Sequence, residues 1–213
     1  MSPDAFVDLI RRERCSAILR ARDADVARHA MDAAVRGGFR VVEFTLTTPH
    51  AIELVGEFAK RPDLVVGAGT VLTAEEARAA VGAGARFLVS PVVDEALIAE
   101  ARSLGVAILP GAFTPTEMWR AHRAGAPLVK LFPAPGTGPT YVRQIVGPFP
   151  QLRIVPTAGV DGSNAAAYLE AGAWAVGFVS SLFAADDLAN GRFDRIEERS
   201  RALRSAAAAA RVS

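Results

Sequence analysis

The sequence contains little cysteine, little histidine and almost no lysine. Cys15 is the one cysteine among 213 residues, so no intrachain disulfide can form, which favours a reducing compartment such as the cytoplasm. The three histidines, His29, His50 and His122, lie far apart, and with a single cysteine they give no spacing typical of a metal site. The segment GAGT (67–70) lacks the third glycine of a dinucleotide-binding loop. We therefore expect neither a metal ion nor a cofactor.

Long apolar runs and clustered charge are missing as well. No uninterrupted apolar segment approaches the roughly 18 residues that a membrane span needs, and the N-terminal stretch carries Asp4 and Asp8 where a secretory signal would be apolar. The formal net charge is +1 with no basic block, which argues against nucleic-acid binding. The sequence predicts a soluble, cytoplasmic protein with a single domain over 1–213 that binds neither membranes nor nucleic acid.

The sequence does contain a repeat of short, β-branched apolar runs every 18 to 26 residues. Alanine-rich amphipathic stretches that usually end in glycine lie between the runs, and polar residues suited to N-caps (Thr73, Asp94, Thr114 and Ser163) precede several of them. The runs are 16–20, 39–45, 64–70, 86–90, 106–111, 127–133, 152–157 and 174–180. The amphipathic stretches are 23–36, 49–60, 73–83, 94–104, 114–124, 138–147, 163–171 and 192–211.

Strands that alternate with helices in this way predict a parallel sheet covered by helices. Eight near-equal units favour an α/β fold of the (β/α)8 TIM-barrel type, and the rival is an open, doubly wound sheet. An extra helix over 4–14 is expected to close the N-terminal end of the barrel. In such barrels the active site lies at the C-terminal ends of the strands. The residues expected there are Arg20, Glu43, Thr45, Thr70, Ser90, Pro91, Pro110, Gly111, Lys130, Thr157 and Ser180.

Lys130 is the leading catalytic candidate. The chain has two lysines, Lys60 and Lys130, against 22 arginines, and Lys130 lies inside the apolar run PLVKLFP. Burial disfavours the ammonium form and lowers the pKa of a lysine. A neutral amine attacks a ketone to form an imine, which an arginine cannot do. The alternatives are a side chain that extends to solvent or one that only pairs with Glu43.

Glu43 lies inside the apolar strand VVEFTL, and buried carboxylates are rare unless they are paired or functional. The barrel places it across the mouth from Lys130, where it could transfer protons during imine formation and C–C cleavage. Its alternative role is to neutralise Lys130 or Arg20. Arg20 ends the first strand and could bind a carboxylate through two N–H groups, with a surface arginine as the alternative and Arg22 as a competitor.

The loops after the last two strands are where such barrels often bind phosphate. They comprise residues 157–164 and 179–183, and Gly159 and Ser180 could supply the donors. Ordinary turn chemistry explains the same composition. Asp161 would repel an anion if it pointed inward, so we expect it to cap a turn.

At Lys130 and Glu43 the chain resembles the class I aldolases of the 2-keto-3-deoxy-6-phosphogluconate (KDPG) and 4-hydroxy-2-oxoglutarate (KHG) family, over about residues 10 to 190. The likeness lies in AILRA (17–21), VVEFTLTTP (41–49), VGAGTVL (66–72), FLVSP (87–91), LPGAFTPTE (109–117), VKLFPA (129–134), GPFP (147–150) and VPTAGV (155–160). Motifs in this order are specific to the family.

The resemblance implies a metal-free, cofactor-free aldehyde-lyase of carbohydrate metabolism (the Entner–Doudoroff pathway) that releases pyruvate from a keto acid, commonly as a homotrimer. By residue, it implies Lys130 as the Schiff-base lysine, Glu43 as the general acid/base, Arg20 and Thr70 as contacts to the pyruvate carboxylate, Pro91 and Phe132 as pocket walls, and Gly159 and Ser180 as phosphate contacts.

Three positions depart from the family pattern. Some members have arginine at the position of Thr47, many have glycine at that of Ala158, and glycine is usual at that of Val179. The last two carry side chains where a phosphate would approach the backbone.

Three functions therefore remain as hypotheses. The first is cleavage of KDPG to pyruvate and glyceraldehyde 3-phosphate. The second is the same chemistry on KHG, on 2-keto-3-deoxy-6-phosphogalactonate or on an unphosphorylated keto acid. The third is a non-catalytic barrel that binds a sugar phosphate.

Overall fold

Strands and helices alternate along the whole computed structural model, which describes residues 1–211. The helices are α1 (Pro3–Glu13), α2 (Ala24–Arg36), α3 (Ala51–Phe58), α4 (Ala74–Ala83), α5 (Glu95–Ser103), α6 (Pro115–Arg123), α7 (Pro139–Val146), α8 (Ala165–Glu170), α9 (Ala185–Ala189) and α10 (Phe193–Ala208). The strands are β1 (Cys15–Leu19), β2 (Val41–Thr45), β3 (Val65–Gly69), β4 (Phe87–Val89), β5 (Ala107–Leu109), β6 (Gly111–Ala112), β7 (Val129–Leu131), β8 (Ile154–Pro156) and β9 (Val176–Phe178). Each predicted run forms a strand and each predicted stretch a helix. Only α9 and the division of one run into β5 and β6 were not predicted.

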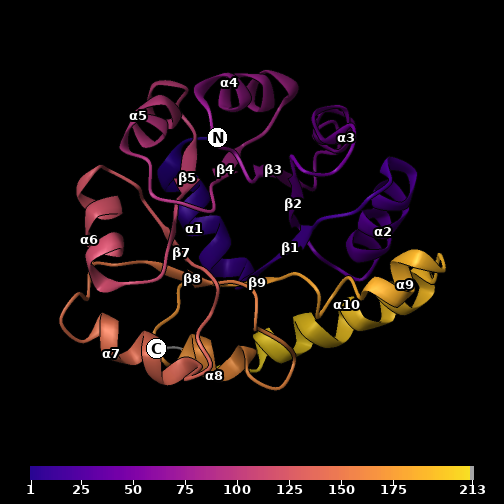
Figure 1. Cartoon of the computed structure of the whole chain (residues 1–213). Helices are drawn as coiled ribbons and strands as arrows, with labels where there is room; N and C mark the ends of the chain where they lie inside the picture. Colours follow the sequence, from indigo (N-terminus) through magenta and orange to yellow (C-terminus); the bar gives the residue numbers. More distant parts are fainter. Residues whose placement is uncertain (212–213) are drawn as a thin grey trace.

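All strand pairs are parallel, as the repeat predicted. One sheet has the order β5-β4-β3-β2-β1-β9 and the other β6-β7-β8. Pro110 joins β5 to β6, and at the other end a single bridge between Thr157 and Gly177 joins β8 to β9. The structure therefore shows an α/β fold with a curled parallel sheet and helices around it (Figure 1). The predicted α/β fold with a parallel sheet is confirmed, and the strands form two separately hydrogen-bonded sections.

The helix starts follow local capping chemistry. Thr73, Asp94 and Thr114 each accept hydrogen bonds from backbone N–H groups in the first turn of the next helix, which satisfies donors that have no partner within the helix. The predicted cap at Ser163 is wrong, because its hydroxyl donates instead to Asp161 Oδ1 at 2.6 Å. Asp161 thus organises a turn, as expected.

Helix α1 closes one end of the curled sheet, which confirms the role predicted for a helix over 4–14. Phe6, Val7 and Ile10 are buried, and the ring of Phe6 stacks on that of Phe87 from β4 at 4.4 Å between centroids. In Figure 1 the indigo helix α1 lies within the ring of strands, with the other helices outside. Among the described residues, no helix has both the length and the apolar character needed to cross a membrane.

Candidate active site

Side chains on alternate positions of neighbouring strands point into the curled sheet, because paired residues of parallel strands face the same side. These side chains enclose a cavity of ≈ 10 Å³, about the size needed for one water molecule. Its lining residues are Phe6, Ile10, Ser16, Ile18, Val41, Glu43, Phe87, Val89, Leu109, Lys130, Val155 and Thr157. The polar members of this set therefore meet inside an otherwise apolar enclosure.

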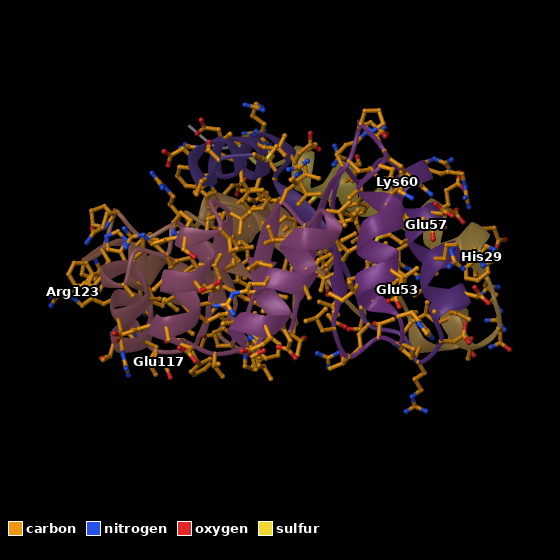
Figure 2. The ribbon with its side chains drawn as sticks, turned by 90° about the horizontal axis from the view of Figure 1, so that it is seen from above. His29, Glu53, Glu57, Lys60, Glu117 and Arg123 are labelled. Carbon is orange, nitrogen blue, oxygen red and sulfur yellow. The ribbon has the colours of Figure 1, made fainter. Side chains whose placement is uncertain are left out.

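Lys130 is buried in the middle of β7, between two buried aliphatic residues, with 8 % of its surface exposed. Its Nζ lies 4.8 Å from the centroid of the Phe132 ring. Burial lowers the pKa of Lys130, while the negative charge of Glu43 raises it and the positive charge of Arg20 lowers it further. The other lysine, Lys60, is exposed beyond the end of α3 at the periphery (Figure 2). Of the two lysines, only Lys130 has the desolvated environment that a nucleophilic amine needs.

Glu43, on β2, is 2 % exposed. Burial raises its pKa, and the positive charges of Lys130 and Arg20 oppose that increase. Its Oε1 atom is buried and has no hydrogen-bond partner within residues 1–211. A buried acceptor without a partner costs about 1–3 kcal/mol, and such groups concentrate where a ligand or a reaction uses them.

The position of this carboxylate depends on Gly69, the last residue of β3. A Cβ atom at Gly69 would lie 1.8 Å from Glu43 Oε1 and 2.7 Å from its Cδ. Glycine thus leaves the space that the carboxylate occupies. The sequence identified the acid but not the residue that makes room for it.

Arg20 follows β1 and is exposed. Its charge acts on both Lys130 and Glu43, so it lies within electrostatic range of the pair. A hollow of ≈ 780 Å³ opens beside it, lined by Arg20, Ala21, Arg22, Asp23, Val26, Thr47, Pro49, Ala185, Leu188 and Ala189. Arg22 also lines this hollow but does not contribute to the pKa shifts of the pair, which favours Arg20 over Arg22.

Thr70 directly follows β3, and Pro91 lies two residues beyond the end of β4. Thr70 has φ 60, a left-handed conformation that is unfavourable for a β-branched residue and costs about 1–3 kcal/mol. Strain of this kind concentrates at ligand-binding positions. A Cβ at Gly111 would lie 2.4 Å from the carbonyl oxygen of Pro91, and Gly111 is the register partner of Lys130. Pro91 is therefore packed against β6, the strand that pairs with the lysine-bearing strand β7.

The two loops expected to bind phosphate lie against each other. Gly159 and Ser180 are both exposed, and Ser181 Oγ donates to the carbonyl oxygen of Val160 at 2.7 Å. Ala158 has φ 60 and Gly159 has φ 97, so Ala158 adopts the left-handed conformation that glycine usually takes. Ala158 therefore holds a backbone conformation that is unfavourable for a residue with a side chain.

Residues 7–199 match the family described as KDPG and KHG aldolase. The chain belongs to this family. It is 40% identical over 150 residues to the 2-dehydro-3-deoxy-phosphogluconate aldolase of Pseudomonas aeruginosa, which covers 70% of this chain and 68% of that protein. It is 37% identical over 178 residues to the KHG/KDPG aldolase of Escherichia coli, which covers 79% of this chain and 80% of that protein.

A solved aldolase structure matches the fold. The KDPG aldolase of Legionella pneumophila, with pyruvate captured as a covalent carbinolamine, superposes with a TM-score of 0.84. It is 28% identical and covers 92% of this chain and 97% of its own. The family resemblance predicted from the motifs is thus confirmed, while the roles of individual residues stay predictions.

Ser16 was not predicted as a site residue, although it lines the same cavity as Lys130 and Glu43. Ile18 is the register partner of Glu43, so a period of two places Ser16 on the same inward face. This alternation along the strand is the signal from which the inward position of Ser16 could have been predicted. Across the residues that the structure describes, no group of three or more His, Cys, Asp or Glu could hold a metal ion.

Proposed function

We propose that this protein is a class I aldolase that cleaves KDPG to pyruvate and glyceraldehyde 3-phosphate through an imine on Lys130. The observation that supports this function most is that Lys130, which is 8 % exposed and whose pKa is lowered by burial, shares a cavity with Glu43, which is 2 % exposed. Membership of the KDPG and KHG aldolase family supports this assignment. The carbinolamine of the Legionella aldolase shows covalent pyruvate chemistry in a relative.

The neutral amine of Lys130 attacks the C2 carbonyl carbon of the substrate to give a carbinolamine, and loss of water gives a protonated imine. A base removes the proton of the C4 hydroxyl, the C3–C4 bond breaks, and its electron pair moves towards the iminium nitrogen to give an enamine. The aldehyde leaves, C3 takes up a proton, and water releases pyruvate. Glu43 supplies and accepts these protons, and burial raises its pKa above the ordinary range of a carboxyl group.

The remaining predicted residues surround this reaction centre. Arg20 binds the pyruvate carboxylate with Thr70, the residue with the strained backbone. Pro91 and Phe132 form the walls, which is supported by the 4.8 Å between the ring of Phe132 and the lysine nitrogen. The substrate phosphate binds the backbone of the paired loops at Gly159 and Ser180. No metal ion or cofactor takes part in this proposed mechanism.

Borohydride reduction in the presence of pyruvate tests the lysine directly. We expect mass spectrometry to find one reduced pyruvate adduct on the peptide that contains Lys130, and none in a Lys130→Arg variant. An adduct on Lys60 alone, or no adduct on folded protein, would contradict the mechanism. Glu43→Gln should retain the adduct but lose about 10²–10⁴-fold in kcat, since it keeps the amine and removes the proton carrier.

A second substrate class has a specific observation in its favour. Thr47 stands where some members of the family have arginine and lines the ≈ 780 Å³ hollow, so this position offers no positive charge to a substrate phosphate. KHG or an unphosphorylated keto acid would then be the substrate, and 2-keto-3-deoxy-6-phosphogalactonate is the phosphorylated alternative. Comparison of kcat/KM for KDPG and KHG decides between phosphorylated and unphosphorylated substrates, because a working phosphate site discriminates strongly.

We also propose that the two sheet sections form one (β/α)8 barrel and that the protein is a homotrimer. The bridge between Thr157 and Gly177 supports closure of the barrel. Leu72, Val92 and Phe113, which follow β3, β4 and β6, are 49%, 49% and 42% exposed, and such apolar groups favour burial against another subunit. Light scattering coupled to size-exclusion chromatography tests the trimer. The cytoplasmic location stays a prediction.

A further inference from the structure

One side chain joins the two loops of the proposed phosphate site. Ser181 is half-buried, and its Oγ donates to the carbonyl oxygen of Val160 at 2.7 Å across 21 positions in sequence. Val160 follows Gly159, and Ser181 follows Ser180. This hydrogen bond therefore lies one residue from each predicted phosphate contact and links the loop after β8 to the loop after β9.

Helix α10 also holds the loop after β9 through two hydrogen bonds. Arg199, on α10, donates from Nη1 to the carbonyl oxygen of Leu182 at 2.8 Å and from Nη2 to Asp187 Oδ2 at 2.5 Å. Asp187 is 3 % exposed, so this charged pair is partly shielded from solvent and stronger than a surface pair. The anchor fixes the residue next to Ser181, and Ser181 can therefore hold the facing loop in place.

The loop after β8 is held in a matching way. Asn164 Nδ2 donates to the carbonyl oxygen of Gly159 at 2.9 Å, while Ser181 binds the next carbonyl along. The C=O and N–H of a trans peptide point in opposite directions. Holding the Gly159 carbonyl on Asn164 therefore fixes the N–H of Val160 on the opposite side of that peptide.

We propose that Ser181 is a positioning residue that fixes the separation of these two loops and thereby sets the preference for phosphorylated over unphosphorylated substrate. An anion is bound by several N–H groups only when they converge, so the phosphate depends on the relative placement of both loops. A keto acid without phosphate makes no use of that placement. This inference rests on the proposed aldolase function.

The decisive variant is Ser181→Ala, which removes one hydroxyl from a half-buried surface position. We expect KM for KDPG to rise about fivefold, which corresponds to the loss of one hydrogen bond of about 1 kcal/mol, with kcat and KM for KHG unchanged. Ser181→Thr keeps the hydroxyl and should restore KM. The matched control is Ser103→Ala, because Ser103 makes a similar 2.8 Å bond to the carbonyl of Glu100 far from the site.

A second readout does not depend on turnover. Calorimetric titration with inorganic phosphate should give a Kd about fivefold higher for Ser181→Ala than for wild type and for Ser103→Ala. A wild type that cleaves neither substrate would refute the aldolase function, and the phosphate titration would still decide the role of Ser181. Equal increases in KM for both substrates, an unchanged KM for KDPG, or no phosphate binding by wild type would overturn the inference.

Discussion

Substitution of Gly69 by alanine should displace the proposed acid/base without touching it chemically. The added Cβ would lie 1.8 Å from Glu43 Oε1, 2.7 Å from Cδ and 3.1 Å from Cγ. Gly69 does not have a positive φ, so alanine can adopt its backbone conformation. The collision with the carboxylate is therefore the dominant effect of the change.

The expected size of the effect follows from this geometry. Forcing a methyl group into a packed interior costs about 1–3 kcal/mol, partly offset by about 0.4–1 kcal/mol because alanine restricts the unfolded chain. For a domain of this size each kcal/mol lowers Tm by about 2–4 °C. A misplaced Glu43 loses general acid/base catalysis, so kcat should fall by about 10²–10⁴-fold, far more than the loss of stability implies.

The assay measures pyruvate release with lactate dehydrogenase as the coupling enzyme, together with calorimetric Tm. Gly82→Ala is the control, because no atom lies within 4 Å of its Cβ position and alanine stabilises a helix by about 0.5–1 kcal/mol. In a Glu43→Asp background the shorter acid relieves the collision, so Gly69→Ala should cost less Tm there. Wild-type kcat with an unchanged pH profile in Gly69→Ala would refute the reasoning.

Three further changes test the electrostatics and the closure of the sheet. Burial raises the pKa of Glu43 and lowers that of Lys130. The carboxyl therefore destabilises the fold above its ordinary pKa of 4.5 and the amine does so below its ordinary pKa of 10.5. Replacing both by methionine should raise the free energy of unfolding by about 1–4 kcal/mol at pH 7. This gain should become smaller as the pH falls towards 4.5 or rises towards 10.5. A uniform gain at every pH would contradict this. Phe6→Ala should cost about 3–5 kcal/mol in urea unfolding, and a loss below about 1 kcal/mol would show that α1 closes the sheet only loosely. Arg20→Met should raise KM about 10- to 100-fold through loss of a charge-assisted contact, whereas Arg22→Met should leave KM unchanged if only Arg20 binds the carboxylate.

The repeat predicted the strands and helices well because each element carries its own signal. Apolar runs, glycine after helix ends and N-caps such as Thr73 are local features. Helix α9 was missed because its five residues, 185–189, are too few for a helical period. The interruption at Pro110 was missed because it depends on which neighbour each half of the strand pairs with. Ser163 was assigned wrongly because Asp161 competes for its hydroxyl.

The burial of the candidate site was predictable in part for the same reason. Lys130 and Glu43 stand between apolar residues of their own strands, so their burial could be inferred locally. The space left by Gly69 and the bond from Ser181 join separate parts of the chain. Contacts of that kind depend on register and loop shape, which a single sequence does not specify.

The desolvation of Lys130 and Glu43 depends on the opposite end of the curled sheet. A Cβ at Gly67 would lie 2.4 Å from the ring of Phe87, so glycine admits that ring into the interior, where it stacks on Phe6 of α1. These rings line the same ≈ 10 Å³ cavity as Lys130 and Glu43, and they leave almost no room for water beneath the pair. Burial is the largest cause of both pKa shifts. The N-terminal helix therefore contributes to the desolvation of Lys130 and Glu43 as well as to the stability of the fold.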